Sequence, residues 1–317
     1  MELEALAEVL VPAYGDGVEV TGLHRDSGGA SRLTCGFDAI TVAGERHPLI
    51  LRLTTPGLPS GSPLLHEAAL MRAAAAEGVP TPAVIAAGGP ESLLGADFVI
   101  MARIEGETIP RRILRDPALA AVRPLLAAQC GETLAAIHRI PVATVPELDA
   151  GDQLATWGAL LEGTGLPHPA LELGLRRLGG QRPVRAAMTV LHGDFRNGNL
   201  IIGPDGIRAV LDWELAHLGD PLEDLGWLCA KAWRFGSPLP VGGFGTYDQL
   251  VSAYERASGT KVDRAALHWW ETFAVFKWAV VCIMQAQRHL SGGERSVELA
   301  ALGRRVAESE WDLLQML

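Results

Sequence analysis

Residues 191–225 concentrate the side chains of this sequence that could do chemistry. Short apolar runs separate the polar residues, which are His192, Asp194, Asn199, Asp212, Glu214, Asp220 and Asp224. The runs 199–202 and 207–211 predict two short strands, and the sequence Gly-Pro-Asp-Gly at 203–206 predicts a turn between them. Carboxylates that stand just beyond strand ends can point into a cleft.

The spacing of Asp194 and Asn199 suits phosphoryl transfer, a reaction that needs positioning and charge neutralisation more than a covalent intermediate. The two residues are separated as the base and the metal-binding amide are in the catalytic loop of a kinase. Asp212 follows a predicted strand, where a carboxylate could hold Mg²⁺ against phosphate oxygens. Taken singly, Asp194 could be a solvent-facing loop residue and Asn199 a turn residue. Their order as a set favours catalysis.

The stretch carries three ordered motifs, His192-Gly-Asp-Phe-Arg-Asn-Gly-Asn199, Val210-Leu-Asp-Trp-Glu214 and Gly219-Asp-Pro-Leu-Glu-Asp-Leu225. Together they resemble the aminoglycoside-phosphotransferase family of kinase-like enzymes. Arg52 and the C-terminal residues 302–314 resemble the branch whose kinase-like domains are associated with acyl-CoA dehydrogenases. The resemblance implies an α+β, bilobal, protein-kinase-like fold, with a small β-rich N-terminal lobe and a large helical C-terminal lobe.

The resemblance also implies roles within this stretch. Asp194 would be the base that meets the acceptor hydroxyl, and Asn199 and Asp212 would bind Mg²⁺. His192 would orient the loop. Arg196 would either neutralise the transferring phosphoryl group or be a surface arginine paired with a neighbouring acid, and both readings stay open.

Three other acids follow in the same stretch. We expect Asp220 and Asp224 to brace the lobe through backbone amides and helix capping. Glu214 would either reach the substrate or hold a partner of the site.

The resemblance implies that the N-terminal lobe binds the nucleotide. Arg52 stands where a lysine is usual, and a guanidinium can also hold phosphate oxygens; Glu67 would orient it. Main-chain groups from Met101 to Arg103 would bind adenine, which leaves ATP and GTP undistinguished. A small-residue segment would lie over the phosphates, although a Gly-Gly turn is more often only a hairpin; its residues are Ser27, Gly28, Gly29 and Ser31.

The pattern of elements agrees with two lobes, residues 1–104 and 105–317. Strands are expected at 18–23, 32–42, 48–54, 84–86 and 98–104, with helices at 3–10 and 64–77. Helical periodicity then dominates, with helices expected at 118–139, 154–161, 170–177, 224–233, 247–258, 264–288 and 296–316.

Composition narrows the function classes. The 317 residues carry a formal net charge of −10, and no cluster of basic residues offers a groove for nucleic acid. The four cysteines have neither metal-site nor disulfide spacing. We find no secretory signal or membrane span and expect a cytoplasmic protein. The oligomeric state is left open.

The aromatic C-terminal helices are expected to choose the acceptor. Trp227, Trp233, Trp269, Trp270 and Trp278 lie there, and such residues are more often core than pocket. An apolar cleft would suit an acyl-like or apolar alcohol better than a polycationic sugar. The leading hypothesis is therefore an ATP/Mg²⁺-dependent kinase of a small-molecule hydroxyl. The alternatives are a kinase that inactivates aminoglycosides or macrolides, and a nucleotide-binding pseudokinase.

Overall fold

The computed structural model describes residues 3–25, 32–54, 63–185 and 187–317. Contacts between residues group the chain into two units. The first consists of Met1–Gly106, Pro141–Glu147 and Arg208–Glu214, and the second of Glu107–Ile140, Leu148–Ile207 and Leu215–Leu317. Asp212 therefore belongs to the first unit although it comes late in the chain. The predicted division at 104/105 did not foresee the two later segments of the first unit.

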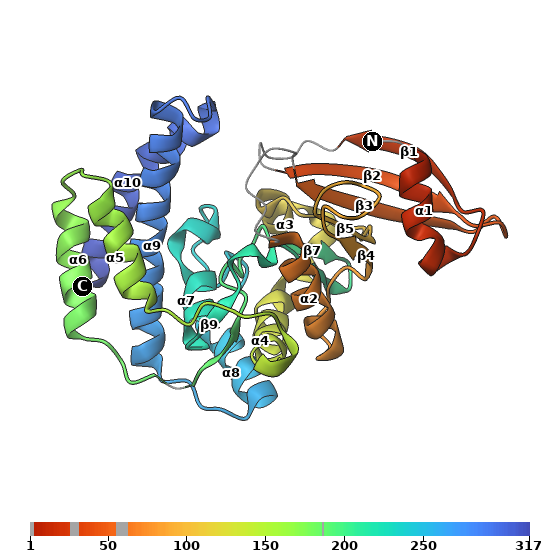
Figure 1. Cartoon of the computed structure of the whole chain (residues 1–317). Coiled ribbons are helices and arrows are strands. Elements are labelled where there is room, and N and C mark those ends of the chain that lie inside the picture. Colours follow the sequence, from red (N-terminus) through yellow and green to blue (C-terminus); the bar gives the residue numbers. More distant parts are fainter. Residues whose placement is uncertain (1–2, 26–31, 55–62, 186) are drawn as a thin grey trace. The chain divides into compact units, whose positions relative to one another are not determined.

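The first unit is built on an antiparallel sheet with the strand order β1-β2-β3-β5-β4 (Figure 1). Its strands are β1 (Glu19–Arg25), β2 (Arg32–Ile40), β3 (Arg46–Thr54), β4 (Val84–Gly88) and β5 (Phe98–Ala102). Two helices accompany them, α1 (Leu3–Tyr14) and α2 (Pro63–Ala76).

Side-chain alternation along β3 separates its core face from its functional face. Leu49, Leu51 and Leu53 pack in one apolar cluster with Leu10 of α1. Because successive side chains of a strand point to opposite faces, Arg52 leaves the sheet on the other side. A single strand thus supplies both core leucines and a cation for chemistry.

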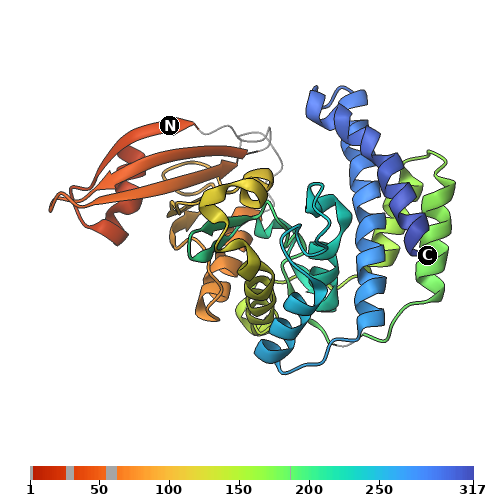
Figure 2. The ribbon, with the colours of Figure 1, turned by 180° about the vertical axis from the view of Figure 1, so that it is seen from behind.

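The second unit is mainly helical, and α9 is its longest helix. Helices α5, α6, α7 and α10 all contact α9, and Figure 2 shows α10 running beside it. The α-helices are α3 (Pro110–Arg115), α4 (Leu126–Ile137), α5 (Gln153–Gly163), α6 (Pro169–Gly180), α7 (Leu222–Cys229), α8 (Tyr247–Ser258), α9 (Arg264–Leu290) and α10 (Val297–Met316).

Four short strands frame the central stretch. β6 (Thr189–Leu191) pairs with β9 (His217–Gly219) in antiparallel fashion. β7 (Leu200–Gly203) pairs with β8 (Gly206–Val210), as the turn sequence between them predicted. The loop 192–199 therefore begins and ends at strands, which limits how far its backbone can move.

Several element boundaries differ from the sequence predictions. The helix expected at 118–139 begins only at Leu126, because Pro117 and Pro124 open two 3₁₀ turns before it. The helix expected at 224–233 ends at Cys229, since Ala230 has an extended ψ of 139°. The strand expected to reach residue 104 ends at 102, and α3, β6 and β9 were not expected.

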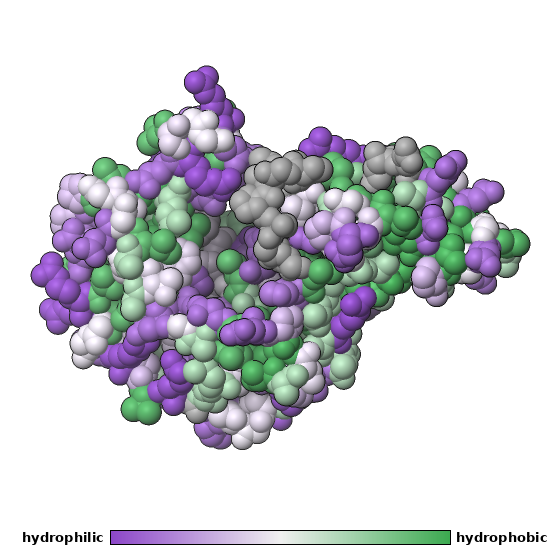
Figure 3. All heavy atoms as spheres, in the orientation of Figure 1, coloured by the Kyte–Doolittle hydropathy of each residue, from purple (hydrophilic) through white to green (hydrophobic). Residues whose placement is uncertain are grey.

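The polarity of the surface, the burial of the cysteines and the length of the apolar helices complete the description of the fold. Figure 3 shows hydrophilic residues interspersed with apolar ones over the face in view. All four cysteines are buried. Among the described helices, none combines the length and the apolar character that crossing a bilayer requires.

Candidate active site

The loop 192–199 is anchored by a buried carboxylate. Asp224 of α7 is fully buried and accepts the backbone N–H groups of His192 at 2.8 Å and Gly193 at 2.9 Å. His138 Nε2 lies 3.2 Å from the same carboxylate. Asp220 accepts the Leu222 N–H at 2.9 Å at the start of α7. These contacts confirm that both acids brace backbone amides.

The buried His192 ring also orients this loop. Its Nδ1 accepts the backbone N–H of Asp194 at 3.2 Å, and its side chain is closed off from solvent. The ring therefore fixes the peptide that precedes the Asp194 side chain, in agreement with the orienting role expected for it.

Three donors hold the carboxylate of Asp194. Trp227 Nε1 donates to Oδ1 at 2.7 Å, and Arg196 Nε lies 3.0 Å from the same oxygen. Asn199 Nδ2 donates to Oδ2 at 2.6 Å and to the Asp194 carbonyl at 3.0 Å. Charge-assisted contacts of this kind fix an anionic side chain in one orientation. A carboxylate held in this way could accept a proton.

Arg196 is paired with an acid, and that acid is Asp194 itself. Its Nε is 3.0 and 3.2 Å from the two carboxylate oxygens. Its guanidinium also stacks on the indole of Trp233, with Cζ 4.5 Å from the ring centroid. Arg196 is therefore paired with a neighbouring acid, as one of the two alternatives expected. That acid is a residue of the candidate site. The role of Arg196 toward a phosphoryl group stays a prediction.

Asn199 is oriented so that a cation could use its oxygen. Only 2 % of the residue is exposed, and its amide nitrogen faces Asp194. The amide oxygen is therefore turned away from that carboxylate. Amide and carboxylate oxygens are the ligands that Mg²⁺ prefers in proteins, so the donor chemistry of Asn199 and Asp212 fits this ion.

Within the first unit, Arg52 lies between two carboxylates. Its Nη1 is 2.7 Å from Oε2 of Glu67 in α2, and its Nη2 is 3.5 Å from Oδ1 of Asp212. The expected pair between Arg52 and Glu67 is therefore present.

Asp212 has an unusual backbone. Its φ is +60°, in the left-handed region that residues other than glycine seldom occupy. Asp and Asn tolerate this conformation better than most residues. The turn puts a half-exposed carboxylate just after β8, as the sequence predicted for a metal ligand. Glu214, two residues further on, is exposed.

The other nucleotide-binding assignments stay predictions. Met101 lies in β5, but the Arg103 N–H donates to Pro48 O at 3.0 Å and the Ala102 N–H to Ala83 O at 2.9 Å. These two N–H donors are thus used inside the first unit. Ser27, Gly28, Gly29 and Ser31 lie outside the described residues.

Sequence reasoning missed two contributors. Trp227 was taken as probable core, yet its N–H binds Asp194. Its position three residues after Asp224 was the available signal, because one helix carries both. Lys277 interrupts an apolar tract of the sequence, residues 273–284, and it is 3 % exposed. A lone lysine inside such a tract signals a buried charge with a partner.

The antiparallel sheet of the first unit, the helical second unit and the loop that carries Asp194 and Asn199 define a protein-kinase-like fold. The model of the phosphotransferase enzyme family matches residues 26–270. The chain belongs to this family.

Known proteins resemble this chain over most of its length. Acyl-CoA dehydrogenase family member 10 of Mus musculus is 30% identical over 294 residues, which cover 83% of this chain and 27% of that protein. The chain spans between 27% and 38% of the first two curated relatives it matches.

Solved structures share the fold. A protein of Ralstonia eutropha assigned as an aminoglycoside phosphotransferase has a TM-score of 0.75 at 21% identity, covering 99% of this chain and 98% of that one. Aminoglycoside phosphotransferase APH(4)-Ia, in a ternary complex with AMP-PNP and hygromycin B, has a TM-score of 0.62 at 16% identity, covering 98% and 97%.

Proposed function

We propose that this protein is an ATP- and Mg²⁺-dependent phosphotransferase that moves the γ-phosphoryl group to a hydroxyl of a small molecule. The fixed carboxylate of Asp194 carries the proposal, because three donors orient it in a member of a phosphotransferase family. The complex of APH(4)-Ia with AMP-PNP supports a nucleoside triphosphate as the donor.

Asp194 acts as the base in this proposal. The acceptor oxygen bonds to the γ-phosphorus while the bond from that phosphorus to the bridging oxygen breaks, and ADP leaves. The hydroxyl proton passes to the Asp194 carboxylate, whose orientation by Trp227 and Asn199 supplies the required positioning.

Charge neutralisation falls to the remaining residues. Arg52 would hold phosphate oxygens with the donors that Glu67 and Asp212 leave available. Asn199 and Asp212 would each offer an oxygen ligand to Mg²⁺, which would neutralise phosphate charge.

The acceptor is proposed to be an acyl-like or otherwise apolar alcohol. A cavity of about 790 Å³ in the second unit is lined by Val275, Trp278 and Trp311 and by charged residues. Each lining cation has an acidic partner: Lys231 pairs with Asp312, Arg234 with Glu271 and Arg305 with Glu308. Trp278 packs on Trp233 with ring centroids 4.7 Å apart, and the Arg196 guanidinium stacks on the Trp233 ring. Balanced charges and aromatic walls suit an apolar molecule better than a polycation.

Calorimetric titration with Mg·ATP and Mg·GTP tests the catalytic assignment. We expect Asp194→Ala to keep nucleotide affinity while transfer falls by about 10²- to 10⁴-fold, the usual contribution of a general base.

Asp212→Asn, which suits the left-handed backbone, should weaken Mg²⁺-dependent binding by about tenfold or more through loss of a charged ligand. An unmutated protein without Mg²⁺-dependent affinity for either nucleotide would overturn the proposal.

A screen for ATP consumption tests the acceptor class. Hydroxylated acyl compounds, macrolides and aminoglycosides are compared in a coupled ADP assay, with Asp194→Ala as the background. We expect turnover with an apolar alcohol and a rise in its KM in Trp278→Ala. Turnover confined to aminoglycosides would contradict the apolar assignment and leave the kinase proposal standing.

A further inference from the structure

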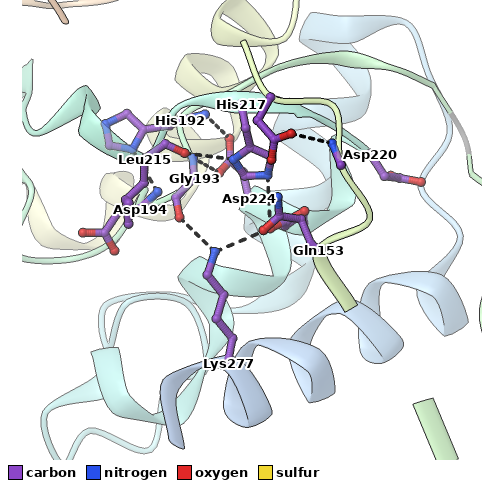
Figure 4. Close-up of polar contacts among 12 residues, drawn as sticks. Gln153, His192, Gly193, Asp194, Leu215, His217, Asp220, Asp224 and Lys277 are labelled. Atoms are coloured by element: carbon purple, nitrogen blue, oxygen red, sulfur yellow. Dashed lines mark hydrogen bonds and ion pairs between the residues drawn. The ribbon is translucent and has the colours of Figure 1, made fainter. Parts of the chain in front are cut away.

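A buried ammonium group lies against the loop that carries Asp194. Lys277 of α9 is 3 % exposed, and its Nζ is 3.4 Å from the Gly193 carbonyl oxygen and 3.5 Å from Glu223 Oε1. The same Nζ stands 4.8 Å from the ring centroid of Trp227 and 5.4 Å from that of Trp157. Figure 4 shows the side chain directed at Gly193.

A lysine in such a place needs compensation. Burying a charge is costly unless it is paired, and a buried pair is seldom retained for stability alone, because apolar residues of similar size often serve stability better. Glu223, itself 4 % exposed, supplies the opposite charge. Lys277 therefore has a counter-charge, and two of its other contacts, with Gly193 O and with the Trp227 ring, lead to the Asp194 loop.

A histidine completes the cluster. His217 Nε2 is 3.3 Å from Glu223 Oε1, and its Nδ1 lies 2.8 Å from the Leu215 carbonyl. Burial lowers the pKa of His217, but Glu223 and, more weakly, the Leu215 carbonyl outweigh burial and the repulsion from Lys277, so the pKa is raised. The cluster thus joins a lysine and a histidine through one carboxylate.

We propose that Lys277 is a positioning residue that sets the orientation of the Asp194 carboxylate, acting on the Gly193 carbonyl and on the indole of Trp227. This inference rests on the proposed role of Asp194 as base. The Gly193 carbonyl belongs to the peptide that joins Gly193 to Asp194, and Trp227 donates to Asp194 Oδ1 at 2.7 Å. Lys277 thus acts on Asp194 through the Gly193–Asp194 peptide and, separately, through the Trp227 indole.

The backbone around Gly193 explains why one contact can matter. Gly193 has φ +78°, and a Cβ built on it would lie 2.1 Å from the Leu215 carbonyl oxygen. Leu215 therefore closes one side of this residue, while Lys277 holds its carbonyl oxygen. Loss of the ammonium removes the contact on this carbonyl oxygen and leaves the backbone held by the N–H groups of Gly193 and Asp194.

The test uses the full chain with ¹⁵N-labelled tryptophan, and Trp227→Phe assigns the indole N–H signal of Trp227. In Lys277→Met, which keeps the apolar length of the side chain, we expect this signal to move toward that of a non-bonded indole. We also expect phosphate release from Mg·ATP, with water as acceptor, to fall about tenfold, a loss of about 1.4 kcal/mol in transition-state stabilisation, while the Kd for Mg·ATP stays within about twofold. Lys261→Met is the matched control, since that side chain is 89% exposed.

The result that would overturn the proposal is an unchanged Trp227 signal together with an unchanged rate in Lys277→Met. If that variant fails to fold, Lys277→Met combined with Glu223→Met removes both buried charges. The Trp227 signal and the rate of phosphate release of this double variant then test the proposal. An unmutated protein that neither binds Mg·ATP nor releases phosphate contradicts the proposed function instead. The indole signal still reports on positioning in that case.

Discussion

At the scale of single residues, Asp224 does the most to hold the candidate site together. Burial alone would raise its pKa, but the hydrogen bond from His138, the nearby charges of His138 and His192 and the His192 N–H lower the pKa to about 2. The ionised carboxylate accepts the amides that start the Asp194 loop. Folding is therefore coupled to the charge of one residue.

This coupling predicts how stability depends on pH. A carboxyl group whose pKa is lower in the folded protein stabilises it above the unfolded pKa, and that stabilisation is lost as the pH falls from about 4 to about 2. We expect Asp224→Asn to lower the free energy of unfolding at pH 7 by about 3 kcal/mol or more, as breaking a buried charge pair does. Its stability should also change less between pH 4 and pH 2 than that of the unmutated protein.

Chemical unfolding at a series of pH values provides the measurement. Asp248→Asn is the control, because that side chain is 88% exposed and should leave both the stability and its pH dependence nearly unchanged. Parallel pH profiles for Asp224→Asn and the unmutated protein would contradict the coupling.

At the scale of elements, the approach of α7 to α9 sets where the site residues stand. Helix α7 carries Asp224 and Trp227, and α9 carries Lys277. A Cβ at Gly226 would lie 2.6 Å from the Trp270 carbonyl carbon and 2.7 Å from the Glu271 nitrogen. The two backbones are this close only because position 226 has no side chain.

Gly226→Ala is therefore expected to force the helices apart. We predict a loss of about 1–3 kcal/mol in the free energy of unfolding, the usual effect of overpacking, together with a shifted Trp227 indole signal. Gly179→Ala is the matched control in α6, because a Cβ there meets nothing within 4 Å and alanine favours helix by up to about 1 kcal/mol. Equal stability changes in the two variants would refute the packing argument.

At the scale of the whole molecule, the sequence predicted most of the helices and strands and the fold class. Alternation in β3 and helical periodicity after residue 118 are local patterns, so they could be predicted without a structure. The family resemblance extended this to the fold and to the motif residues. The pairing of Arg52 with Glu67 was expected on the same ground and is present.

What escaped prediction depends on contacts between residues distant in the chain. Residues 208–214 group with the first unit, which no linear division reveals. In the sequence, Trp227 is one of several aromatic residues and Lys277 is a single charge among apolar residues. In the folded chain, Trp227 contacts Asp194 and Lys277 contacts Gly193. The broken start of α4 is different, because Pro117 and Pro124 were visible in the sequence and their effect was underestimated.

The left-handed backbone at Asp212 affects how variants of this protein should be interpreted. Only a few residue types tolerate this φ, so a library selected merely for folding would already favour Asp, Asn and Gly at position 212. Which residues are tolerated at position 212 therefore depends on the backbone conformation as well as on metal binding. Comparing Asn with Gly separates the two, because both accept the turn and only Asn keeps an oxygen that a metal ion could use.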